Sequence, residues 1–130
     1  MLSSEIHKIY FVSTAFNEEK NLWSLYQRCI NSFEEVNQGN LEFNMILIDN
    51  GSEDKSYRVI KDIIKVDKRV IGFRNVKTYA PEVSFSFGMK KAIEKDADFI
   101  IILCSDLQDP PELTQKIISK IIDKNNKLDS

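Results

Sequence analysis

Short apolar runs alternate with longer amphipathic stretches along this chain. Runs rich in β-branched and aromatic residues predict four strands, over residues 8–14, 43–48, 69–73 and 99–103. Apolar residues at steps of three and four predict helices between these strands and after the last one. The alternation is typical of an α/β domain, with a mostly parallel sheet of about four strands and helices on both faces.

Local residue types set the expected ends of the helices. A first helix is expected over residues 18–38, with Asn17 as its cap and Gly39 as its end. Residues 75–84 are predicted to form a loop. The Pro-Pro pair at 110–111 is expected to open the last helix, because proline suits a first helical turn.

Length and charge suit one ordinary domain. The 130 residues are assigned to a domain over residues 1–124 and a polar tail over residues 125–130. The 18 Lys and Arg are offset by 20 Asp and Glu, so no nucleic-acid partner is expected. Residues 99–104 form the longest apolar run, which is far shorter than the roughly 20 residues that cross a bilayer. Two cysteines, the absence of a signal-like start and this short run together predict a cytoplasmic protein.

Several enzyme classes can be excluded from the residues present. The chain has 4 glycines, placed so that neither a dinucleotide-binding G-x-G-x-x-G nor a phosphate-binding G-x-x-x-x-G-K-[ST] loop exists. Its one histidine, His7, makes Ser-His-Asp hydrolysis and multi-histidine zinc sites improbable.

Three of the predicted strands end in polar clusters, at residues 14–19, 49–52 and 105–109. The carboxyl ends of parallel strands share one edge of a sheet, where ligands of open α/β sheets bind. The sequence therefore predicts that these three clusters meet around one ligand site.

Each cluster allows a chemical and a structural interpretation. The cluster at 105–109 supplies hard oxygen donors, Asp106, Gln108 and Asp109, which suit Mg²⁺ or Mn²⁺ bound to a diphosphate. Alternatively, it forms an acidic turn in which Asp109 caps the next helix. The Asp49-Asn50 pair could bind a base and a ribose, or form a simple turn with Asx hydrogen bonds.

The cluster at residues 14–19 also allows two interpretations. Phe16 could stack on a base, although an aromatic residue at a strand end is more often part of the core. Glu18 and Glu19 could contact a ligand, or lie in a first helical turn where negative charge is favourable.

The motifs Asp-Leu-Gln-Asp-Pro-Pro-Glu at 106–112, Ala-Phe-Asn-Glu-Glu at 15–19 and Asp-Asn-Gly-Ser-Glu-Asp at 49–54 closely resemble family 2 glycosyltransferases of the GT-A fold. Within this family, the motifs resemble those of bacterial polyprenyl-phosphate glycosyltransferases and dolichyl-phosphate mannose synthases. The resemblance spans nearly the whole chain in the right order. It implies a Rossmann-like domain that binds a nucleotide-sugar, with the region that binds the acceptor following residue 130.

The resemblance also implies roles for individual residues. Asp106 would ligate Mg²⁺ or Mn²⁺ on the donor diphosphate, assisted by Gln108. Gly88 would be a small residue opening a helix beside the site. The residues implied in contacting the nucleotide-sugar are Thr14, Ala15, Phe16, Glu18, Asp49, Asn50, Arg74, Ser105 and Asp106.

Two departures from the family pattern bear on this chemistry. Cys104 stands where the family has the first aspartate of its Asp-x-Asp motif, and a protonated thiol is a poor ligand for Mg²⁺ or Mn²⁺. Asn50 stands where a second aspartate is usual, which would alter base recognition because asparagine both donates and accepts.

The expected function is binding of a nucleotide-diphosphate sugar, of UDP type, for inverting transfer to a polyprenyl phosphate or a saccharide. No catalytic base is assigned in this chain, and membrane association is expected only through segments outside it. One alternative is a non-catalytic binding or assembly module of the same fold. A phosphate-accepting signalling domain is disfavoured, because no acidic pair ends the first predicted strand.

Overall fold

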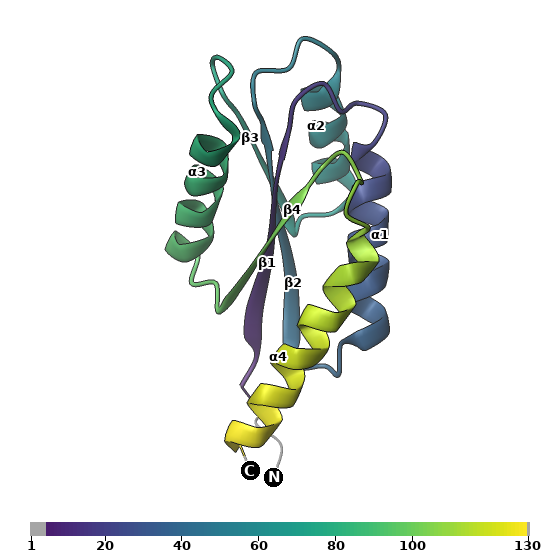
Figure 1. The fold of residues 1–130 in the computed structure, drawn as a ribbon, viewed down its shortest axis with the longest axis vertical. Helices are drawn as coiled ribbons and strands as arrows, with labels where there is room; N and C mark the ends of the chain where they lie inside the picture. The colour runs from purple at the N-terminus through teal and green to yellow at the C-terminus, as the bar shows by residue number, and fades with distance from the viewer. Residues whose placement is uncertain (1–4, 130) are drawn as a thin grey trace.

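The computed structural model describes residues 5–129, and the side chains of residues 5–124. All strand pairings in this part of the chain are parallel, and the sheet has the order β3-β2-β1-β4 (Figure 1). This confirms the predicted parallel sheet of about four strands. The strands are β1 (His7–Ala15), β2 (Leu41–Asp49), β3 (Val70–Arg74) and β4 (Phe99–Cys104).

Helices cover both faces of the sheet, as the alternating pattern predicts. Helices α1, α2 and α4 lie on one face and α3 lies on the other (Figure 1). The helical elements are α1 (Leu22–Val36), α2 (Ser56–Val66), α3 (Pro81–Glu94), a 3₁₀ turn η1 (Pro111–Leu113) and α4 (Thr114–Asp129). No helix in the described range is long and apolar enough to cross a bilayer.

Alternate residues of the central strands feed two separate cores. Ile9 and Phe11 of β1 are fully buried in the cluster that includes residues of α1, α2 and α4. Tyr10 and Val12 belong to a smaller cluster, which includes Ala92 of α3. This period of two is that of a strand buried on both faces.

Gly88 lies in the middle of α3, so the expectation that it opens a helix is wrong. A Cβ atom at this position would come within 2.5 Å of Val12 Cγ1 and 2.8 Å of Ile48 Cδ1. The missing side chain therefore lets α3 pack closely against β1 and β2.

Two predicted features of the first helix are wrong. Helix α1 begins at Leu22, with Asn21 as its N-cap residue, and ends at Val36, before Gly39. Asn17 has a φ of 55° and does not cap α1. Its side chain instead accepts hydrogen bonds from the N–H groups of Glu53 and Asp54, so its role is set by the chain after β2.

The remaining boundaries also shift. Helix α3 begins at Pro81, so part of the predicted 75–84 loop forms its first turn. The second residue of the Pro-Pro pair, Pro111, begins the 3₁₀ turn η1, and α4 follows from Thr114 to Asp129.

The strand order creates a switch point beside β1. The chain passes from β1 outward to β2 and β3, and then crosses to the other side of β1 to form β4. The carboxyl ends of β1 and β4 therefore lie side by side at the point where the strand order reverses, which is where ligands of open α/β sheets bind.

Candidate functional site

Strand register brings the three polar clusters to one edge of the sheet. At the carboxyl end of β1, Ala15 pairs with Asp49 of β2, and Thr14 pairs with Cys104 of β4. Asp49 in turn pairs with Arg74 at the end of β3. The predicted convergence of the strand ends is confirmed.

A hollow of about 200 Å³ lies at the switch point between β1 and β4. Six of the residues expected at the nucleotide-sugar site line it, and so do Cys104 and two residues of α3. We call it the donor hollow, after the nucleotide-sugar donor that the sequence resemblance leads us to expect there. Its lining residues are Thr14, Phe16, Glu18, Asn50, Pro81, Phe85, Cys104, Ser105 and Asp106.

Two residues that line the donor hollow, Phe16 and Ser105, differ in exposure. Phe16 is 47% exposed, so it is not part of the core and is available to a ligand. Ser105 is buried, and its hydroxyl donates to the carbonyl oxygen of Thr14 at 2.7 Å. This bond fastens the chain after β4 to the end of β1.

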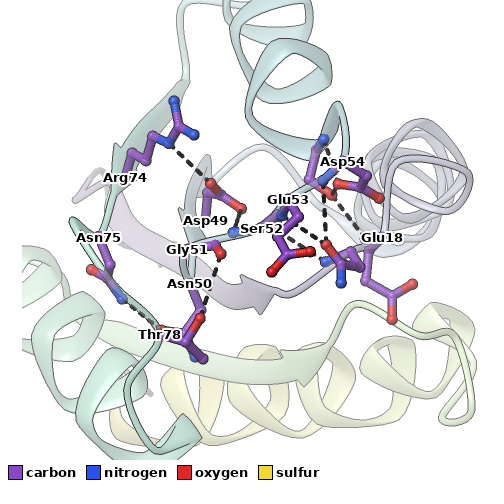
Figure 2. A network of polar contacts seen from close by, with 12 residues as sticks. Glu18, Asp49, Asn50, Gly51, Ser52, Glu53, Asp54, Arg74, Asn75 and Thr78 are labelled. Carbon is purple, nitrogen blue, oxygen red and sulfur yellow. Dashed lines mark hydrogen bonds and ion pairs between the residues drawn. The ribbon is translucent and has the colours of Figure 1, made fainter.

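Three expected residues lie outside the donor hollow. Ala15 and Asp49 are buried, at 2% and 0% exposure. Arg74 is exposed, and its Nε atom lies 3.5 Å from the Asp49 carboxylate (Figure 2). Its guanidinium lies over the Tyr57 ring. Arg74 borders a second hollow of about 440 Å³, lined by Gly51, Ser52, Arg74, Asn75, Val76, Lys77 and Thr78.

Glu18 precedes α1, so the interpretation that it lies in a first helical turn is wrong. Its carboxylate accepts a hydrogen bond from the Asn21 side chain at 2.7 Å. Its backbone N–H donates to the Ser56 hydroxyl at 2.8 Å. Glu18 therefore stays beside the donor hollow because α2 holds its backbone.

Polar contacts join the segment after β1 to the segment after β2 (Figure 2). The Asn17 N–H donates to the Ser52 hydroxyl at 2.9 Å, and the Glu53 N–H donates back to the Asn17 side chain at 2.9 Å. Asp54 accepts from the N–H of Ser56 at 2.8 Å and from that of Glu19 at 3.3 Å. We call these contacts the brace.

The charge of Asp54 is part of the brace. Burial acts to raise the pKa of this carboxyl, but hydrogen bonds from Ser56 and from the Glu19 N–H outweigh it and lower the pKa below its usual value. The ionised form is therefore the one that the fold favours.

The segment after β4 offers a sparse set of metal donors. Asp106 is exposed, and one of its carboxylate oxygens accepts the Gln108 N–H at 3.1 Å. Burial, together with the nearby charges of Asp106 and Asp109, raises the pKa of the Cys104 thiol, so this sulfur is protonated at neutral pH. Across the described side chains, no three His, Cys, Asp or Glu residues come together as a metal cluster.

This donor set fits a hard cation only in a minimal form. Mg²⁺ commonly uses one or two carboxylates and takes its other ligands from substrate phosphates and water. Asp106 can serve as such a carboxylate, whereas the Cys104 thiol cannot. Gln108 is exposed and does not line the donor hollow.

The alternative reading of Asp109 as a helix cap is not supported. Pro110 occupies the N-cap position of η1, and no side chain caps that turn.

The sequence model of Glycosyl transferase family 2 matches residues 10–128. The chain belongs to glycosyltransferase family 2. This confirms the family expected from the three motifs at the strand ends.

Individual relatives agree with this assignment. An undecaprenyl-phosphate 4-deoxy-4-formamido-L-arabinose transferase of Proteus mirabilis is 31% identical over 116 residues, covering 88% of this chain and 34% of that protein. A UDP-N-acetylglucosamine–dolichyl-phosphate N-acetylglucosaminyltransferase of Methanococcus voltae is 26% identical over 126 residues, covering 88% of this chain and 47% of that protein.

Solved structures share the fold. S. aureus TarS 1-349 superposes with a TM-score of 0.63 and 17% identity, over 90% of this chain and 32% of that one. The same protein in complex with UDP gives a TM-score of 0.59 and 17% identity, over 76% and 27% of the two chains. The predicted GT-A type of α/β fold is confirmed. The chain spans about a third of the length of the P. mirabilis protein and of the TarS 1-349 chain.

Two features of this family 2 domain escape sequence reasoning. Pro81 and Phe85 line the donor hollow because α3 starts earlier than expected, and proline at a first helical position was the available signal. Arg28 of α1 makes a paired ion contact with Glu112, with an Nε–Oε2 distance of 2.9 Å. This contact anchors the chain after Asp106 to α1, and hydrogen bonding to Arg28 lowers the pKa of Glu112.

Proposed function

We propose that this family 2 domain binds the donor of a glycosyltransferase, a nucleoside diphosphate sugar of UDP type. The proposed reaction is inverting transfer of the sugar to a lipid phosphate or a saccharide. One observation carries the proposal: the donor hollow at the switch point between β1 and β4 is lined by an exposed aromatic ring and an exposed carboxylate.

The lining of the donor hollow supports binding of a nucleoside at one end and a diphosphate at the other. Phe16, Pro81 and Phe85 supply apolar surface on which a base can stack, and Thr14 and Glu18 supply polar groups beside it. Typical small-molecule sites occupy roughly 300–1,000 Å³. At about 200 Å³ the hollow holds part of a nucleotide-sugar, and the rest extends along the open edge of the sheet.

The names of relatives favour this donor and these acceptors. The Methanococcus protein is named for UDP-N-acetylglucosamine and dolichyl phosphate, and the Proteus protein for undecaprenyl phosphate. TarS was crystallised with UDP. A cytoplasmic location, at the membrane face for a lipid acceptor, follows from the same proposal.

We assign Asp106 as the residue that holds a divalent cation, Mg²⁺ or Mn²⁺, with Gln108 assisting. Such a cation neutralises charge on a leaving nucleoside diphosphate. The protein contributes a carboxylate fixed to β1 through its neighbour Ser105 and to α1 through the Arg28–Glu112 pair. The remaining ligands would come from the donor phosphates and water.

A second candidate function is a non-catalytic nucleotide-sugar-binding or assembly module. It is favoured by Cys104, which gives the metal position a protonated thiol in place of a carboxylate. Binding without cation dependence would distinguish this module from the transferase domain.

Calorimetry with UDP, in the presence and absence of Mn²⁺, tests the proposal. Wild-type protein should bind UDP more tightly with Mn²⁺, and Asp106→Asn should weaken that binding by about tenfold or more, because an amide replaces the charged ligand. Asp62→Asn on α2, where Asp62 pairs with Lys65, is the matched control and should bind as wild type does. Absence of UDP binding under both conditions would remove the donor-site proposal.

A further inference from the structure

The side chain of Asn50 is occupied by contacts within the protein. It is 4% exposed, and its amide oxygen accepts from the Tyr79 N–H at 3.0 Å and from the Asn75 side chain at 2.8 Å. Its amide nitrogen donates to the carbonyl oxygen of Tyr79 at 2.9 Å. Both accepting positions of the oxygen and one of its two N–H groups are therefore used.

The pairing with Tyr79 fixes which way the amide faces. Its oxygen meets a backbone donor and its nitrogen meets the backbone acceptor of the same residue. Reversing the amide would set donor against donor and acceptor against acceptor. We call residues 75–80 the strap. The Asn50 side chain thus pairs with the strap backbone at Tyr79 as a neighbouring strand would.

Other contacts press the strap against the end of β2. The Asn75 N–H donates to the carbonyl oxygen of Asp49 at 2.9 Å, and the Asn75 side chain donates to the Ser84 hydroxyl of α3 at 2.8 Å. A Cβ atom on Gly51 would come within 2.8 Å of backbone atoms of Lys77 and Thr78. The strap and the turn after β2 are therefore in direct backbone contact.

The strap leads directly into a wall of the donor hollow. It ends at Ala80, which is the N-cap residue of α3, and Pro81 and Phe85 in the next turn line the hollow. Movement of the strap away from Asn50 would therefore move this wall.

We propose that Asn50 is a positioning residue, which clamps the strap and so holds Pro81 and Phe85 in place for donor binding. This inference rests on the proposed donor site. The side chain at position 50 must donate a hydrogen bond to the Tyr79 carbonyl oxygen, which an asparagine amide can do and an ionised aspartate cannot. An aspartate would place a carboxylate oxygen near that carbonyl at neutral pH, where two acceptors repel. Restoring the family's more usual aspartate should therefore weaken donor binding in this chain.

Hydrogen exchange of the strap, measured without nucleotide, tests the clamp independently of the proposed function. Asn50→Asp should raise the exchange rate of peptides within residues 75–80 on the order of tenfold, as expected for loss of one buried hydrogen bond. Exchange in β1 and α1 should stay unchanged. Asn44→Asp, at a half-exposed position on β2 where the side chain bonds to Glu42, is the matched control for the charge change.

UDP calorimetry on the same variants tests the consequence. Asn50→Asp should bind UDP several-fold more weakly than wild type and Asn44→Asp.

Unchanged strap exchange in Asn50→Asp, or faster exchange throughout the protein, would overturn the clamp. If Asn50→Asp does not fold, Asn50→Ser serves in its place, because it removes the amide without adding charge and should give the same faster strap exchange. If wild type binds no UDP while strap exchange responds, the donor proposal fails and the clamp stands.

Discussion

The two sides of the candidate site differ in how firmly they are held. On the side of β1 and β2, Asp49, Asn50, Ser52 and Ser56 are nearly or fully buried and hydrogen-bonded or ion-paired to neighbouring segments. On the side of β4, the residues at 106, 108, 109 and 112 are exposed. That side is fastened mainly through the Ser105 hydroxyl and the Arg28–Glu112 pair.

This difference separates two tasks within one site. A buried, hydrogen-bonded scaffold preorganises its surface and lowers the entropic cost of binding a ligand. On the proposed function, the braced side shapes the nucleoside end of the donor hollow. The open side carries a single hollow-lining carboxylate, Asp106, beside a protonated thiol. On the proposed function, this side would gain further order from the bound diphosphate and its cation.

The strongest way to break the braced side is to separate the strap from the turn after β2. Gly51 has a φ of +74°, and a Cβ atom there would meet the strap backbone at 2.8 Å. Gly51→Ala should lower the free energy of unfolding by about 2–4 kcal/mol, through backbone strain and a clash that flexible side chains cannot relieve. Urea denaturation measures this loss.

Gly39→Ala separates the two causes. Gly39 also has a positive φ, of +93°, but its Cβ position has no neighbouring atom within 4 Å. It should therefore lose only the strain component, about 1–2 kcal/mol. Equal losses at the two positions would show that close approach of the strap does not constrain the turn.

The difference between the two sides also explains which features could be predicted from the sequence. The strands follow from dense β-branched and aromatic runs, and the convergence of their ends follows from parallel pairing alone. Phe16, Glu18 and Asp106 were predicted near one another, and the donor hollow contains all three. No local signal was needed beyond the order of strands and helices.

The braced side was harder to predict, because its contacts join residues far apart in the chain. Asn17 looks like a helix cap in its local sequence, yet it accepts from the N–H groups of Glu53 and Asp54. Residues 75–84 lack clear periodicity, since the strap is ordered by Asn50 and not by its own pattern. Nonlocal hydrogen bonds of this kind leave little trace in sequence spacing.

The open side can be sharpened by restoring a carboxylate. Cys104→Asp should strengthen Mn²⁺-linked UDP binding by about tenfold, which corresponds to roughly 1.4 kcal/mol, because a second oxygen ligand joins Asp106. Calorimetry at fixed Mn²⁺ concentration measures the change. Cys104→Ser removes the thiol without adding charge and should bind as wild type does. If the aspartate and serine variants bind equally, Asp106 already suffices for the cation.

The smallest expected effect tests whether charge contributes to the brace. Asp54 has a lowered pKa in the folded protein, so its stabilisation is present above the unfolded value, near 4, and is lost as pH falls through the folded value. Asp54→Asn should therefore cost about 1 kcal/mol at pH 7, where wild type has a charged acceptor for the N–H groups of Ser56 and Glu19. Below about pH 4 the carboxyl of the unfolded chain takes up a proton before that of the folded protein does, so the stability advantage of the wild type should shrink toward the level of Asp54→Asn. Urea denaturation at pH 7, 5, 4 and 3 follows this convergence, with Asp62→Asn as an exposed control that should track wild type to within about 0.5 kcal/mol. A gap that persists unchanged to pH 3 would mean that the shape of the Asp54 side chain, and not its charge, holds the segments after β1 and β2 together.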